Sequence, residues 1–123
     1  MRINFDESKP IYLQIADAIK KAIVRGEYGM GDKVPSVREL AIELKVNPNT
    51  VQHAYQELLR EGVIFTKRGQ GNFVTEDPEK LRELRESMLN QLVDKFVDDL
   101  KGIGIPIEKE KILKLLEEEN DRS

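Results

Sequence analysis

The amino-acid sequence predicts a mainly α-helical protein with one small β-hairpin and a helical tail. Apolar residues recur at helical spacing through most of its 123 residues, which indicates amphipathic helices. Two of these stretches lie on either side of Val46, with too few residues between them for a long loop. By contrast, β-branched and aromatic residues flank a glycine-containing polar loop between Val63 and Thr75, which is typical of a hairpin.

Composition narrows the possible classes of protein. Apolar residues make up 39% and charged residues 35%, which suits one domain, or one domain with an appendage. The chain contains no cysteine, so disulfides, cysteine zinc sites and thiol catalysis are excluded. The first ten residues contain no apolar run, and no stretch approaches a membrane span of about 20 residues. We therefore expect a cytoplasmic protein without a signal peptide, and we expect no metal or other cofactor.

The first predicted helix follows a polar arm, Met1–Lys9, in which Ile3 and Phe5 are isolated apolar residues that suit packing on the body of the protein. Ser8 before Pro10 is a helix-start signal, and the helix is predicted from Pro10 to about Arg25, with Gly26 ending it. Its apolar stripe comprises Ile11, Ile15, Ala18, Ile19, Ala22 and Ile23.

The second and third helices form a pair joined by a tight turn. Ser36 is expected to cap the second helix, because Glu39 follows at capping-box spacing. Asn47 is expected to cap the third helix, and Pro48 takes its first helical position, where a missing N–H costs nothing. The buried side of the third helix comprises Val51, Ala54, Tyr55, Leu58 and Leu59.

The other side of the third helix is polar. It comprises Asn49, Gln52, His53, Gln56 and Arg60. A second helix of such a pair can lie in a DNA major groove, where an Asn or Gln amide can pair with adenine. An ordinary helical hairpin with a solvated polar face is the alternative, since such hairpins recur in unrelated folds.

A basic loop follows directly after this helix pair. Lys67, Arg68, Gly69 and Gln70 form the predicted tip of the hairpin. A solvated turn is the alternative interpretation of the tip alone. Three helices followed by a two-stranded wing is, however, the order expected of a winged helix-turn-helix.

Charge is distributed unevenly along the chain. The formal net charge is −3. Residues 1–76 carry 11 Lys and Arg against 10 Asp and Glu, whereas residues 77–123 carry 9 against 13. Any affinity for DNA must therefore come from where the cations lie rather than from bulk charge.

The tail, residues 77–123, is predicted to be separate from a DNA-binding domain at residues 1–76. Pro78 opens a long helix to about Lys101, and a last helix runs from about Ile107 to Glu119. The broad apolar stripe of the long helix needs a partner surface. A symmetric homodimer is expected, because it is the commonest closed assembly. Folding of the tail back onto the winged helix is the alternative. The predicted dimerisation residues are Leu84, Met88, Leu92, Phe96, Leu100, Ile112 and Leu116.

Several motifs together resemble the DNA-binding domain of the GntR family of bacterial transcription regulators. They are P-x-Y-x-Q-I at Pro10–Ile15, G-D-K-V-P-S-V-R-E-L-A at Gly31–Ala41, V-N-P-N-T-V at Val46–Val51, A-Y-x-E-L-x-x-E-G at Ala54–Gly62 and R-G-x-G-x-F-V at Arg68–Val74. The match covers about 65 residues. The short tail resembles that of the YtrA-like branch, in which a two-helix region serves dimerisation and no large effector domain is present.

The resemblance implies which residues contact DNA. Arg38 matches a family arginine that contacts DNA, and the start of the third helix matches the contacting segment. The predicted DNA-binding residues are Ser36, Arg38, Asn47, Asn49, Thr50, Gln52, His53, Lys67, Arg68, Gly69 and Gln70. Family members often have an arginine early in the third helix, where this chain has Pro48 and Gln52, so the base preference does not transfer.

Most of these side chains have more than one possible role. Arg38 suits a phosphate or a base at the groove edge, because a guanidinium fork binds both. Asn49 and Gln52 are expected to read bases, with phosphate positioning as the other role. Asn47 is equally a simple cap, and His53 contacts phosphate or is solvated. Lys67 and Arg68 are expected to add salt-sensitive affinity that does not depend on base sequence.

The sequence thus predicts a sequence-specific, dimeric DNA-binding regulator. A repressor is favoured over an activator, because occluding a promoter requires only occupancy, and the operator is expected to be an inverted repeat near the protein's own operon. The alternative is a protein–protein adaptor built on a winged helix. An enzyme is not expected: no nucleophile–base constellation is present, and Asp94, Asp98 and Asp99 lie where an amphipathic helix ordinarily carries charge.

Overall fold

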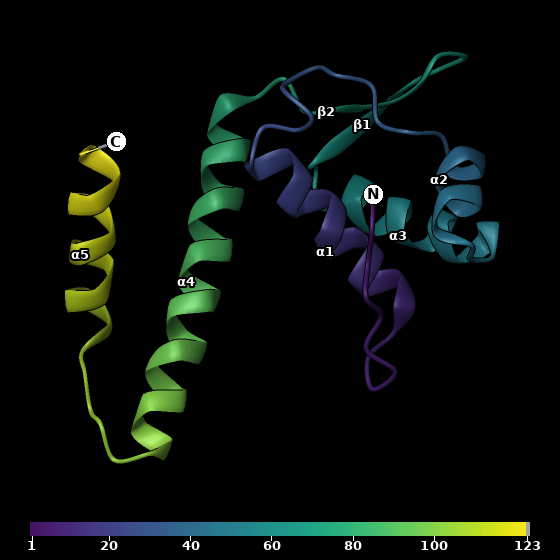
Figure 1. Cartoon of the computed structure of the whole chain (residues 1–123). Helices are drawn as coiled ribbons and strands as arrows, with labels where there is room; N and C mark the ends of the chain where they lie inside the picture. The colour runs from purple at the N-terminus through teal and green to yellow at the C-terminus, as the bar shows by residue number, and fades with distance from the viewer. Residues whose placement is uncertain (123) are drawn as a thin grey trace. The chain divides into compact units, whose positions relative to one another are not determined.

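The computed structural model describes residues 1–122. Within them the chain forms helices and one antiparallel hairpin, which confirms the mainly α-helical fold with a small β-hairpin (Figure 1). The elements in chain order are α1 (Ile11–Val24), α2 (Val37–Leu44), α3 (Pro48–Arg60), β1 (Ile64–Lys67), β2 (Gly71–Val74), α4 (Pro78–Gly102) and α5 (Lys109–Asp121).

The chain divides into two compact units. The first is Met1–Leu84 and the second is residues 85–123. Helix α4 belongs to both, since its residues up to Leu84 lie in the first unit. The domain boundary predicted after Glu76 stays a prediction.

The core of the first unit is built where α1, α2 and α3 meet the hairpin. Ile15 and Ile19 of α1, Leu40 of α2 and Leu58 of α3 are fully buried in it. The apolar sides of the three helices therefore face one another, whereas Ile11 of the predicted α1 stripe is exposed. Ile3 and Phe5 of the N-terminal arm are half-buried against this core, as expected from the sequence.

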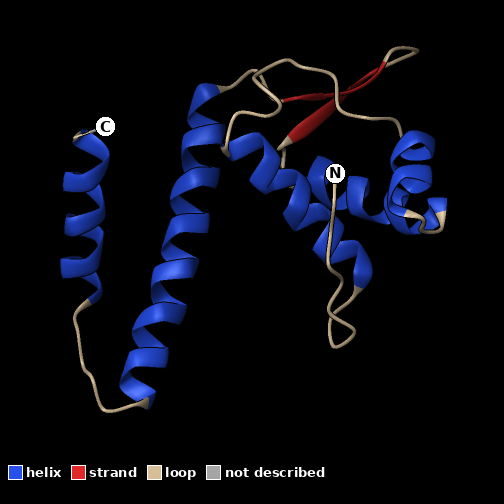
Figure 2. Cartoon of the chain, in the orientation of Figure 1, coloured by secondary structure: helices blue, strands red, loops and turns tan. Residues whose placement is uncertain are grey.

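The hairpin pairs β1 with β2 in the register Phe65 with Phe73 and Lys67 with Gly71. Figure 2 shows the two strands in red, with their loop extending beyond the helices of the first unit. Lys33 forms an isolated bridge with Phe73, which places a third piece of extended chain beside β2. The prediction that Lys67 belongs to the tip of the hairpin was wrong, because Lys67 is the last residue of β1.

The start of α1 differs from the prediction. Pro10 is the N-cap residue rather than the first helical residue, and no side chain caps the helix. The Ser8 hydroxyl instead donates to an Asp6 carboxylate oxygen at 2.7 Å. Ser8 therefore closes a turn inside the arm, two residues too early to cap α1.

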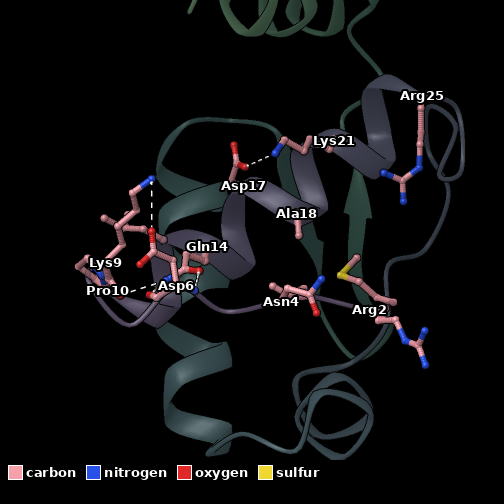
Figure 3. A pocket seen from close by; sticks show the side chains of 13 residues that line it. Arg2, Asn4, Asp6, Lys9, Pro10, Gln14, Asp17, Ala18, Lys21 and Arg25 are labelled. Carbon is pink, nitrogen blue, oxygen red and sulfur yellow. Dashed lines mark hydrogen bonds and ion pairs between the residues drawn. The ribbon is translucent and has the colours of Figure 1, made fainter. Parts of the chain in front are cut away.

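Gln14 fastens the N-terminal arm to α1. Its Nε2 donates to the carbonyl oxygens of Asp6 at 2.7 Å and Lys9 at 3.0 Å, and its Oε1 accepts from Asp6 N at 2.8 Å. The arm and α1 border an open hollow of about 640 Å³ (Figure 3). Asp17 pairs with Lys21 at 3.0 Å on its rim, so these charges compensate one another.

The second unit buries few apolar side chains. Val93 and Val97 of α4 are its only residues classed as buried among those the structure describes. Lys109 of α5 pairs with Asp94 of α4 at 2.9 Å. The last helix begins two residues later than predicted, because Glu108 is still extended and serves as its N-cap. Among residues 1–122, no helix is long and apolar enough to cross a membrane.

Candidate nucleic-acid interface

Helix α2 begins in a complete capping box. The Ser36 hydroxyl accepts from Glu39 N at 3.1 Å, and Ser36 N donates to a Glu39 carboxylate oxygen at 3.2 Å. Hydrogen bonding of the Ser36 side chain and backbone to the Glu39 carboxylate holds the pKa of Glu39 below its ordinary value. The box fixes the first turn of α2, from which Arg38 extends into solvent. Ser36, which was predicted to contact DNA, is half-buried and serves as the cap of α2.

The turn between α2 and α3 is short because one residue adopts a left-handed conformation. Lys45 has φ 58° and is the C-cap of α2, and it is the one non-glycine residue with positive φ among residues 1–122. Asn47 follows as an extended N-cap, and its Oδ1 accepts from Asn49 N at 2.8 Å. Pro48 is the first residue of α3, as predicted.

The inner face of α3 is fixed against the rest of the unit. Val51, Ala54, Tyr55 and Leu58 are fully buried. The Tyr55 hydroxyl donates to the carbonyl oxygen of Pro35, just before α2. Burial raises the pKa of the Tyr55 phenol, so the donor stays protonated. Tyr55 therefore belongs to the core, as expected, and it ties α3 to the chain that leads into α2.

The outer face of α3 is open. Asn47, Asn49, Gln52 and His53 are exposed, and Thr50 is half-buried. The early side chains of α3 are therefore presented to solvent from a helix whose back is fixed. Arg60 is also exposed, but it forms an ion pair with Glu57 on the same helix. Its charge is thus partly compensated, unlike that of a free arginine.

The hairpin presents a second group of cations. Lys67 Nζ lies 4.6 Å from the ring centroid of Phe73 and 5.8 Å from that of Phe65, within the range of a cation–π contact. The aromatic pair therefore holds the Lys67 ammonium at the end of β1. Beyond it, Arg68, Gly69 and Gln70 are exposed at the tip, and Gly69 takes the positive φ that the turn requires.

Lys33 is a cation of this surface that the sequence analysis did not select. Its Cε lies 3.0 Å from where a Cβ on Gly71 would stand. Residue 71 must therefore be small for the Lys33 side chain to cross the strand. Lys33 pairs with Phe73, so its side chain shares a face of the hairpin with Phe73 and Lys67. The glycine-containing wing motif could be identified in the sequence, but the position of Lys33 across it could not.

The predicted dimerisation residues differ in exposure. Leu92 is 63% exposed and Phe96 is 51% exposed, whereas Met88, Leu100 and Ile112 are half-buried in the second unit. Leu116 is exposed, and Leu84 packs in part against the core of the first unit. Ile103, Ile105 and Leu115 are also exposed, and the predicted set did not include them. The part they play in dimerisation stays a prediction.

Three packed helices, a capped and outward-facing α3 and a cationic wing define a winged helix-turn-helix protein. The family model for bacterial regulatory proteins of the gntR family matches residues 11–74, from the start of α1 to the end of β2. The chain therefore belongs to the GntR family of transcriptional regulators, and its first unit is a DNA-binding domain of that family.

Relatives extend the similarity into the tail. The chain is 48% identical over 106 residues to the uncharacterized HTH-type transcriptional regulator YhcF of Bacillus subtilis, covering 86% of this chain and 88% of YhcF. It is 40% identical over 110 residues to the HTH-type transcriptional repressor YtrA of the same organism, covering 89% of this chain and 85% of YtrA.

Solved structures agree with this assignment. A GntR family regulator from Listeria monocytogenes superposes with a TM-score of 0.79 at 45% identity, covering 93% of this chain and 98% of that one. The AraR DNA-binding domain in complex with operator ORR3 superposes with a TM-score of 0.54 at 25% identity, covering 61% of this chain and 90% of that one. In that relative the shared domain is bound to operator DNA.

Proposed function

We propose that this protein is a dimeric repressor that binds an inverted-repeat operator near its own operon. The observation that carries the proposal is the outer face of α3. Asn49 and Gln52 are exposed on a helix whose opposite face is fully buried. A recognition helix needs this arrangement, because its polar side chains must enter the major groove without disturbing the core.

The proposed roles follow from the chemistry of each group. Asn49 and Gln52 read base edges, since an amide offers one donor and one acceptor to adenine. Arg38 binds a phosphate or a base at the groove edge, because no ion pair within residues 1–122 occupies its guanidinium. Lys33, Lys67 and Arg68 supply affinity through phosphates of the flanking DNA, which weakens as salt rises.

Dimerisation is proposed for the second unit. Leu92 and Phe96 leave more than half of their surface exposed, one turn apart on α4. Large apolar side chains exposed together mark an interface, and a second copy of the same chain is the simplest partner. Two copies of α3 would then address two half-sites, so the operator is proposed to be an inverted repeat.

Repression is proposed rather than activation. Occupancy alone is sufficient to block a promoter, whereas activation needs a further surface for the transcription machinery. One relative, YtrA of B. subtilis, is itself named a repressor. Occlusion of the promoter by the bound dimer is therefore the simplest mechanism.

The test is binding of purified protein to a duplex taken from upstream of its own gene. Wild type should bind that duplex more tightly than a shuffled duplex, and the affinity should fall as salt rises. Arg38→Ala should weaken specific binding by about tenfold to a hundredfold, since a hydrogen bond to a charged group contributes about 1.5–3 kcal/mol. Arg25→Ala is the matched control, because Arg25 is exposed but ion-paired with Glu27 at the end of α1.

The outcomes separate the alternatives. Equal affinity for both duplexes, or no salt-sensitive binding of either, would favour the adaptor. Unchanged binding by Arg38→Ala would contradict the role assigned to that residue. Binding to a lone half-site as tightly as to the full repeat would contradict the dimeric arrangement.

A further inference from the structure

Two aromatic rings connect α1 to the outer face of α3. The Tyr12 and His53 ring centroids are 3.6 Å apart, and the ring planes differ by 5°. Tyr12 is the second residue of α1 and is half-buried, whereas His53 is exposed on α3. The two rings are therefore stacked face to face at the border between the core and the proposed DNA-binding surface.

The stack leaves the nitrogens of His53 available. In parallel rings each ring covers only one face of the other, so the ring edges point away from the contact. Neither imidazole nitrogen has a hydrogen-bond partner within residues 1–122. Glu57, one turn further along α3, is engaged by Arg60. His53 is thus an oriented side chain with an unused N–H group.

The position of the stack indicates its partner. Residues of the first turn of a recognition helix reach base edges. His53 comes one turn after Asn49, and its ring lies against α1 rather than beside the first-turn side chains. At the side of a recognition helix the DNA presents its phosphate backbone, where contacts fix the register of the protein on the duplex.

We infer that Tyr12 is a positioning residue that holds the His53 imidazole against one DNA phosphate. This inference rests on the DNA binding proposed above. An exposed histidine on its own samples several rotamers and loses that freedom on binding. Stacking on Tyr12 restricts the His53 imidazole already in the free protein. The loss of side-chain entropy is therefore not incurred again when DNA binds. Tyr12 thereby joins the recognition apparatus without touching DNA.

A second contact between the same helices supplies a control. Lys20 of α1 pairs with Glu61 at the end of α3, with Nζ 2.8 Å from Oε1 and 2.7 Å from Oε2. This pair also connects α1 to α3 but lies two turns further along α1 than Tyr12. Lys20→Met therefore weakens the helix contact without altering the His53 stack.

The experiment measures the affinity of the purified full chain for the upstream duplex, with single phosphates replaced by neutral methylphosphonates. For wild type, one replacement in each half-site should weaken binding through loss of the histidine contact. His53→Ala should bind unmodified DNA about tenfold more weakly and should be insensitive to that replacement. Tyr12→Leu, which keeps an apolar side chain for the core, should share both properties, whereas Tyr12→Phe keeps the ring and should behave as wild type.

The double variant and the control complete the test. Tyr12→Leu with His53→Ala should bind no more weakly than His53→Ala alone, because both changes remove one contact. Lys20→Met should lower the melting temperature but keep the wild-type response to methylphosphonates. The inference is overturned if wild type binds the duplex and both His53→Ala and Tyr12→Leu retain its affinity. It is also overturned if Tyr12→Leu weakens binding by the same factor whichever phosphate is replaced. If wild type binds no duplex, the proposed function itself fails.

Discussion

In the first unit Tyr55 and Leu58 of α3 are completely buried, whereas in the second unit Leu92 and Phe96 of α4 are mostly exposed. Both regions carry apolar residues at helical spacing, so such spacing alone does not determine burial. The first unit surrounds its apolar residues with three helices, a hairpin and an arm. The second has two helices, which cannot enclose a core. The first unit thus encloses its own core, and the exposure of Leu92 and Phe96 supports the proposal that the second packs against another surface.

The largest expected effect comes from a charge placed on the exposed face of α4. Phe96→Glu should convert the proposed dimer to a monomer in sedimentation, and affinity for the proposed inverted repeat should fall about 100-fold or more because the two half-sites are no longer linked. Gln91→Glu, at an exposed polar position of the same helix, is the control for added charge. A Phe96→Glu variant that remains dimeric would show that the second copy binds elsewhere.

The same substitution in both units sharpens the comparison. Leu58→Ala should lower the free energy of unfolding by about 3 kcal/mol, since it opens a cavity in a packed core. Leu92→Ala should change it by less than about 0.5 kcal/mol, provided that the protein is dilute enough to be monomeric. Urea denaturation measures both, and similar losses would mean that Leu92 is buried within the monomer.

Replacing glycine by alanine should change the stability of the protein in opposite directions in the two units. Gly71 has φ +123°, and a Cβ there would meet Lys33 Cε at 3.0 Å, so Gly71→Ala should destabilise the protein by about 1–3 kcal/mol. Gly102 ends α4 with no atom within 4 Å of its Cβ position, and Gly102→Ala should stabilise by up to about 1 kcal/mol. Thermal melts at neutral pH compare the pair. A stabilising Gly71→Ala would mean that Lys33 does not cross the wing.

The smallest effect concerns the capping box of α2. The folded state lowers the pKa of Glu39, so this carboxylate contributes stability above its ordinary pKa of 4.5 and loses it as the pH falls through the folded pKa. Wild type should therefore melt at a higher temperature than Glu39→Ala at about pH 7. The difference should shrink at about pH 3. A difference that is the same at both pH values would contradict the role of the charged carboxylate.

Local rules predicted most of the fold. Ser36 with Glu39 and Asn47 with Asn49 fix helix starts through hydrogen bonds within four residues, and Pro48 takes the first position of α3. The sequence therefore suffices to place these starts. The start of the last helix was less well defined by the sequence, because Glu108 offers no side-chain cap. Its backbone is extended, and α5 begins only after it.

Two contacts that the sequence did not predict join residues far apart in the chain. Tyr12 lies near the start of α1, and nothing in the sequence around it indicates that His53 lies against it. Lys33 and Gly71 meet because extended chain pairs with β2, which depends on the tertiary fold. The exposure of Asn49 and Gln52 was predictable, because helical spacing places both outside the apolar stripe of α3.

The hydrogen bond from Tyr55 to the Pro35 carbonyl has a consequence for how such proteins diversify. It holds the recognition helix from behind, on the side that never meets DNA. Mutations at Asn49 or Gln52, the proposed base readers, are therefore expected to alter operator preference at little cost to folding. Duplicated copies of the gene could acquire new target sites through a few codon changes, and a library randomised at these two positions would remain largely folded.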